Sequence, residues 1–160
     1  MVTNAPNADM AHVAISQTEV VQSLDRSTTM FNKGMPGFFD EFAADATIFM
    51  ADSTEPIKGR EAYRNLYNEL LSRASREKTI LDRKIQIVGD KAVVTQKAMI
   101  KEGDSIAYVF QTLIYGQTSE GLKVQHSQTS MLTQPNNDRA TVTVVKEAIA
   151  PSAPVLGVAQ

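Results

Sequence analysis

The hydrophobic period of this 160-residue chain changes once, from the helical 3.6 residues to the strand period of 2, just before residue 79. Apolar and polar residues then alternate through four strand candidates, at residues 79–88, 91–102, 104–116 and 122–133. Gly-Asp, Glu-Gly-Asp and Ser-Glu-Gly sequences between them are typical of tight turns. Strands of 10 to 13 residues twist and bend strongly, so we expect a curved antiparallel sheet.

Three helix candidates precede these strands. Ser16 and Glu19 form a capping box that starts the first helix, Gly34 fits its end, and Pro36 starts a short second helix. Apolar residues at helical spacing indicate a third helix: Tyr63, Leu66, Tyr67, Leu70, Leu71 and Ala74. Residues 46–50 read as one more strand. Helices early and strands late predict an α+β fold, a cone in which the sheet wraps over three helices around a hollow.

The length suggests one domain, at residues 16–133. We expect residues 1–15 to form a loose arm and residues 134–160 to be a C-terminal extension that is mobile or docks on a partner subunit.

Charge and composition exclude several classes of function. A net charge of −2 without any run of like charge argues against nucleic-acid binding. No stretch reaches the ~20 apolar residues of a membrane span, and the first residues do not resemble a signal peptide, so we expect a cytoplasmic protein. Cysteine is absent and only His12 and His126 represent histidine, so we expect no metal site. The sequence has no Gly-rich phosphate loop, so we expect no cofactor.

The last strand candidate carries the main candidate site. Strict alternation puts His126, Gln128 and Ser130 on the same face as Leu122 and Val124, which should point into the hollow. On that face His126 is either a general acid or base or a core histidine with both nitrogens bonded. Buried amide and hydroxyl groups need partners, so Gln128 and Ser130 must contact each other, water or a ligand. A hollow that holds a ligand satisfies both, and we expect them to bind substrate.

Other candidate residues come from the turns and neighbouring strands. Asp52 is either a carboxylate base at the mouth of the hollow or a turn residue that stabilises the following bend. Tyr108 and Gln111 should touch a cavity or an interface, although the sequence does not fix which face each occupies. Phe39 belongs to a Phe cluster that plugs the narrow end or lines the pocket, and Met50 ends the first strand; we expect both to contact substrate.

Three stretches resemble the nuclear transport factor 2-like superfamily, which includes ketosteroid isomerases, SnoaL-like polyketide cyclases, scytalone dehydratase and the association domain of calcium/calmodulin-dependent kinase. NKGMPGFFDEFAADATIFM resembles the family's helix, short helix and first strand. EPIKGREAYRNLYNELLS resembles its third helix and is most similar to the kinase association domain. GLKVQHSQTSM resembles the closing strand, with Leu122 in place of a tryptophan. The likeness covers residues 17–133 and implies the cone fold.

The departures from the family pattern limit what the resemblance implies about function. The resemblance to ketosteroid isomerases places Met50 at the position of their catalytic aspartate. The resemblance to the kinase association domain places Leu113 at the position of its arginine. Only one core histidine is available for the His/Asp/His arrangement of scytalone dehydratase. The chemistry of these relatives is therefore not implied.

Two hypotheses about function remain open. In the first, the hollow binds a small hydrophobic ligand and supports cofactor-free isomerase, cyclase or dehydratase chemistry, with His126 transferring a proton and Asp52 assisting it. In the second, the chain is an association module that forms a homodimer or larger homo-oligomer, and its pocket is vestigial or regulatory.

Overall fold

The computed structural model describes residues 14–73 and 75–132 of the chain. The predicted C-terminal extension lies outside these residues, as does the predicted arm up to residue 13. Ile15, the last residue of that arm, is instead buried in the core. It directly precedes the Ser16 cap and, with the buried Val20, occupies the two positions of a hydrophobic staple that sets the entry angle of the first helix.

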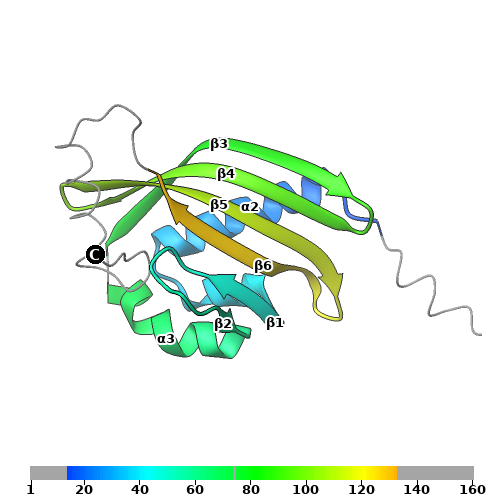
Figure 1. Ribbon diagram of the computed structural model, residues 1–160, viewed down its shortest axis with the longest axis horizontal. Coiled ribbons are helices and arrows are strands. Elements are labelled where there is room, and N and C mark those ends of the chain that lie inside the picture. The colour runs from blue at the N-terminus through cyan, green and yellow to red at the C-terminus, as the bar shows by residue number, and fades with distance from the viewer. Residues whose placement is uncertain (1–13, 74, 133–160) are drawn as a thin grey trace, which may run out of the picture.

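The described elements form one curved sheet with helices on its concave side (Figure 1). In chain order they are α2 (Gln17–Asn32), the 3-10 helix η1 (Pro36–Glu41), β1 (Phe42–Phe49), β2 (Ile57–Lys58), α3 (Arg60–Arg73), β3 (Arg76–Val88), β4 (Lys91–Glu102), β5 (Ser105–Thr118) and β6 (Gly121–Met131). The helix α2 packs behind β3, and α3 packs on η1 and β1. The predicted α+β cone is confirmed.

The sheet has the strand order β2-β1-β6-β5-β4-β3. The pairs of β3 with β4, β4 with β5, and β5 with β6 are antiparallel, as predicted, and β1 joins β6 in parallel. The first strand starts at Phe42, four residues before its predicted start, directly after η1 ends at Glu41.

The helices follow their sequence signals closely. The Ser16–Glu19 capping box is present, and Gly34 follows the end of α2 with a φ of 64°, a conformation that glycine adopts without strain. On α3 the buried residues are Tyr63, Tyr67 and Leu71. Leu66, predicted to be on the apolar face, is 62% exposed, so this part of the prediction is wrong.

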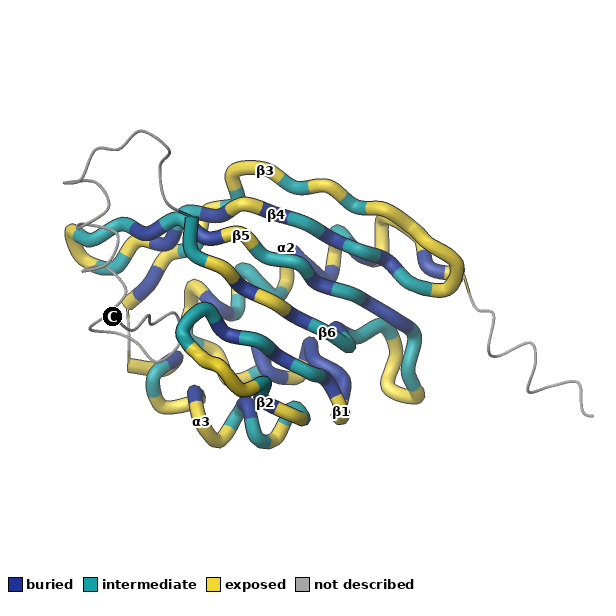
Figure 2. Tube along the Cα trace, in the orientation of Figure 1, coloured by how far each residue is buried: buried dark blue, intermediate teal, exposed yellow. Residues whose placement is uncertain are grey.

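Burial is uneven across the sheet, as Figure 2 shows: β4, β5 and β6 alternate between buried and partly exposed residues, and β3 is mostly exposed. Two irregularities bend the strands. The register of β3 with β4 shifts between Ile80 and Asp82, and that of β5 with β6 shifts between Ile114 and Tyr115. Each shift exchanges the faces on which later residues lie, and the second decides the chemistry of the interior.

Candidate functional site

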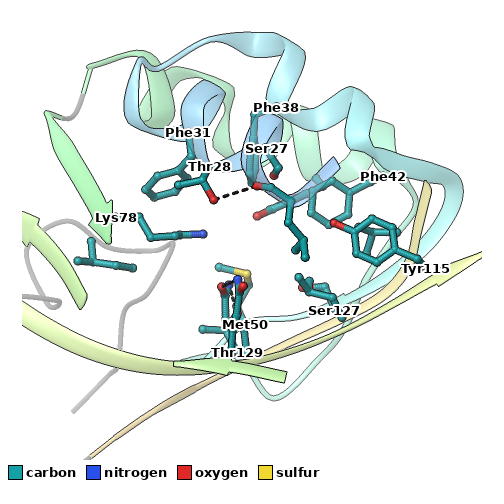
Figure 3. A pocket seen from close by; sticks show the side chains of 17 residues that line it. Ser27, Thr28, Phe31, Phe38, Phe42, Met50, Lys78, Tyr115, Ser127 and Thr129 are labelled. Carbon is teal, nitrogen blue, oxygen red and sulfur yellow. Dashed lines mark hydrogen bonds between the residues drawn. The ribbon is translucent and has the colours of Figure 1, made fainter. Parts of the chain in front are cut away.

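A cavity of about 50 Å³ lies between α2 and the concave face of the sheet (Figure 3). We call it the cone cavity. Its helical side is largely apolar and includes Leu24, Phe31 and Phe38, whereas its sheet side carries Gln96, Gln111, Ser127 and Thr129. One water needs about 10–15 Å³ in this measure, so the cavity holds roughly four water-sized groups. A ligand of that size, or a short end of a larger one, fits this space.

A row of hydrogen-bonded polar side chains crosses the inner face of four strands. Arg83 Nε donates to Gln96 Oε1 at 3.1 Å, Gln96 Nε2 donates to Gln111 Oε1 at 3.0 Å, and Gln111 Nε2 donates to Thr129 Oγ1 at 3.2 Å. Each pair is directly opposite in the strand register, so the sheet itself aligns them. We call these four residues the polar row.

The polar row has a fixed direction. An arginine only donates, so the side of Gln96 that faces Arg83 must be its oxygen, and its amide nitrogen must face the next strand. The same reasoning turns the nitrogen of Gln111 toward Thr129. Thr129 therefore accepts within the row, and among the described residues no acceptor takes the hydroxyl proton of Thr129. Thr129 borders the cone cavity, which makes this hydroxyl a donor available to a ligand.

Lys78 supplies a second donor. The backbone of Lys78 is held at the end of α2, because Asn32 accepts from its N–H at 2.7 Å and donates to its C=O at 3.1 Å. Its amine lies 4.5 Å from the centre of the Phe31 ring and points into the cone cavity in Figure 3. No carboxylate of the described residues forms an ion pair with it. Burial, and secondarily the positive charge of Arg83, lower the pKa of Lys78 to about 8.

Tyr115 closes the cavity opposite Lys78 (Figure 3). Burial raises the pKa of this phenol, and the charge of Glu41 raises it further, so it stays protonated and can donate. Glu41 is itself buried and accepts hydrogen bonds from Ser23 Oγ and from two nitrogens of Arg26. The buried carboxylate is thus satisfied within the protein and does not compete for a ligand.

The closing strand β6 differs from its prediction at one point. The register shift makes Gln125 an extra residue between Val124, which pairs with Tyr115, and His126, which pairs with Ile114. Ser127 and Thr129 consequently face the cavity, whereas Gln128 and Ser130 are exposed. His126 lies on the outer face with its ring 5.6 Å from that of Phe49. The prediction that His126, Gln128 and Ser130 point into the hollow is therefore wrong.

The other predicted residues separate into two groups. Gln111 and Met50 line the cone cavity. Tyr108 is paired with Met99 on the outer face, next to the buried Val109 of the inner face. Phe39 is almost fully buried and borders a separate apolar pocket of about 10 Å³ between η1 and α3, so it fills the narrow end.

Asp52, the predicted base, follows β1 in a turn and is not among the residues that border the cone cavity. Its Oδ1 is buried without a hydrogen-bond partner among the described residues, and burial raises the pKa of this carboxyl. Its charge contributes, after burial, to the raised pKa of Tyr67 on α3. The structure thus puts Asp52 beside α3 and His126 on the outer face of the sheet. The two do not meet in the cavity.

Sequence reasoning missed Lys78, Gln96 and Thr129. Lys78 fell one residue before the predicted start of its strand, and Gln96 is one polar residue in an ordinary alternation. A signal for the change of face on β6 was present at Gly116. A glycine inside a strand often marks a bulge, and a Cβ at this position would lie 2.5 Å from the side chain of Gln125.

In residues 14–73 and 75–132, no three His, Asp or Glu side chains gather closely enough to hold a metal ion. In the same residues, no helix has the length and hydrophobicity needed to cross a membrane.

The SnoaL-like domain family matches residues 20–134, which includes every element that borders the cone cavity. The chain belongs to the SnoaL-like domain family. A search of curated proteins finds no match.

Solved structures show the same fold at low sequence identity. An NTF2-like protein of unknown function from Pseudomonas putida KT2440 is 18% identical, with a TM-score of 0.67 over 75% of this chain and 89% of that one. A protein provisionally assigned as a calcium/calmodulin-dependent protein kinase II association domain, from Xanthomonas campestris, is 18% identical, with a TM-score of 0.65 over 84% and 95%. A provisionally assigned dehydratase of the NTF2-like family, from Streptomyces avermitilis, is 16% identical, with a TM-score of 0.63 over 81% and 100%. These similarities establish the fold.

Proposed function

We propose that this SnoaL-like protein binds a small molecule in the cone cavity through an acceptor oxygen, a carboxylate or a carbonyl. The observation that carries the proposal is the fixed direction of the polar row, which leaves the hydroxyl of Thr129 as a donor at the cavity wall. The Lys78 amine and the Tyr115 phenol border the same space and also donate. Donors that converge without an acceptor of their own favour a ligand that supplies one.

The apolar helical side of the cone cavity favours a ligand whose remaining part is apolar. Phe31, Phe38 and Met50 offer a surface for a short hydrocarbon portion, and a flexible methionine can adjust to its shape. A ligand of about four or five non-hydrogen atoms matches the cavity volume. The sequence predicts a lipophilic metabolite as the ligand. The donors at the cavity wall restrict this class to metabolites that carry an acceptor oxygen at one end. Cofactor-free isomerase, cyclase or dehydratase chemistry remains part of the proposal, without His126 as its proton-transfer group.

The test uses three probes of similar size: propionate, acetone and propylammonium. Both acceptor probes should shift the NMR amide signals of Gln111 and Thr129, and propylammonium, which has no acceptor, should not. Thr129→Val should weaken propionate binding about tenfold, because it removes one hydrogen bond to a charged group. Thr112→Val, on the outer face of β5, is the matched control and should leave the affinity unchanged.

Gln96→Glu is the sharper variant. A carboxylate at position 96 still accepts from Arg83, but it also accepts from Gln111, whose amide must then turn round. The hydroxyl of Thr129 would then donate to the amide oxygen of Gln111, and it would no longer be available as a donor to a ligand in the cavity. We expect about tenfold weaker binding of acetone, which is neutral and does not feel the added charge directly. Equal binding of all three probes, or unchanged binding in both variants, would contradict the proposed function.

A second candidate function is self-association through the outer face of the sheet. Phe110 on β5 is 42% exposed, and Ile114 and Phe49 lie on the same face beside His126. Exposed apolar surface of this kind is typical of interfaces. A second copy of the chain would bury this face, as the sequence hypothesis of a homodimer or larger assembly expects.

Light scattering of the full chain tests this second candidate. We expect a mass of at least two subunits, and Phe110→Asp should reduce it to one by placing a charge in the interface. Leu66→Asp is the control, because this exposed leucine lies on α3 away from the sheet face. A monomer in the unmodified protein, or the same loss of mass in both variants, would rule out the outer face as the interface.

A further inference from the structure

We propose that Lys78 is a covalent binding site for a small aldehyde or ketone, whose carbonyl carbon its amine attacks to form an imine. This inference rests on the proposed function and names its substrate class as carbonyl compounds.

The position of the amine is the first support. The two hydrogen bonds between the Asn32 side chain and the Lys78 backbone fix that backbone, and contact with Phe31 holds the end of the Lys78 side chain inside the cone cavity. The neighbouring cation, Arg83, is tied to Asp25 on α2 at 3.2 Å and to Gln96. No described carboxylate pairs with Lys78, so its nitrogen is not held in the charged form by an ion pair.

The protonation state of the amine is the second support. Only the neutral amine is a nucleophile, and an amine with a pKa of about 8 is neutral in roughly 10% of molecules at pH 7. An ordinary lysine, with a pKa of ~10.4, is neutral in about 0.04%. Lower basicity costs part of this advantage, as it does for thiolates, and leaves a gain of roughly tenfold in rate. An arginine side chain keeps its proton in proteins, so Arg83 is not a nucleophile and does not compete with Lys78 for the carbonyl compound.

The step balances without any co-reactant. The lone pair of Nζ forms the new C–N bond while the carbonyl π electrons move to oxygen, which gives a carbinolamine after proton transfer. The two amine protons and the carbonyl oxygen then leave as water, and a C=N bond remains. The Thr129 and Tyr115 hydroxyls border the same cavity and can donate to the oxygen as its charge develops.

Reductive trapping tests the inference on the full chain. Propanal and sodium cyanoborohydride at pH 7 would convert each imine to a stable propylamine, and peptide mass mapping would give the rate at every lysine. We expect Lys78 to react at least tenfold faster than Lys84, an exposed lysine on the same strand. This advantage should shrink as the pH rises toward 10, where exposed lysines also lose their protons. Propionate should slow Lys78 alone.

Two comparisons make the outcome decisive. Lys78→Arg should abolish the fast reaction, and Lys84→Arg should preserve it; the measurement on the unmodified protein needs neither variant to fold. If Lys78 reacts no faster than Lys84 at pH 7, the covalent site is ruled out. If propionate still binds in that case, the proposed function stands and only this inference fails. If propionate does not bind and Lys78 is still trapped rapidly, the covalent site stands and the acceptor-binding function fails.

Discussion

Phe38→Ala is expected to lower the free energy of unfolding by about 3–5 kcal/mol. Phe38 is buried at the junction of α2, η1 and α3, and its ring centre lies 5.4–5.6 Å from those of Phe31, Phe39 and Phe42. Tyr63 adds a fourth ring at 6.2 Å. These edge-to-face contacts are lost together, and rings anchored on four separate elements cannot all move to fill the space.

Urea unfolding of Phe38→Ala and of Phe110→Ala measures this effect. Phe110 is a phenylalanine of the same size on the outer face, and in a monomeric sample its removal should cost less than about 1 kcal/mol. Similar losses for the two variants would contradict the assignment of Phe38 as the centre of the core.

Lys78→Met is expected to stabilise the fold and to weaken propionate binding. A lysine with a pKa of about 8 in the folded state and ~10.4 in the unfolded state costs up to roughly 3 kcal/mol while protonated in the cavity. Methionine keeps the apolar stem and removes this cost, so we expect a gain of about 1–2 kcal/mol at pH 7. Propionate should bind tenfold to a hundredfold more weakly, because a charge-assisted hydrogen bond contributes about 1.5–3 kcal/mol.

The pH dependence separates this mechanism from simple repacking. Between pH 8 and about 10.4 the unfolded chain binds a proton at Lys78 that the folded chain does not, so stability should rise with pH across this window. In Lys78→Met the rise should disappear, and in Lys84→Met it should remain. Measurements up to about pH 9.5 avoid Tyr63 and Tyr115, whose buried phenols resist ionisation and reduce stability only above their usual pKa near 10. A flat profile in the unmodified protein would show that Lys78 is solvated.

The sequence predicted the architecture because its signals there are local. The Ser16–Glu19 box, the glycine after α2 and the turns between long strands each depend on a few adjacent residues, and all were confirmed. The early start of β1 and the exposure of Leu66 were not predictable in this way. They depend on how η1 ends and on which side of α3 meets the sheet.

The candidate site was predicted less well because it depends on strand register. Gln111 and Met50 both border the cone cavity, and their contact with a substrate stays a prediction. The inward face of β6 was predicted wrongly, since alternation holds only up to Gln125. The polar row could not be predicted from the sequence of any single strand, because the hydrogen-bond partners of Gln96 lie on the two neighbouring strands.

The extra residue Gln125 decides which side chains of β6 face the interior of the cone. A substitution that removed this bulge, so that Gln125 paired with Ile114, would slide the rest of β6 by one residue and turn each later side chain to the opposite face. Imidazole and carboxamide groups would then replace the two hydroxyls within the protein, with no other change of sequence. A lineage of such cones can therefore acquire a different internal chemistry through the gain or loss of one strand bulge, which suits a scaffold shared by proteins of unrelated activity.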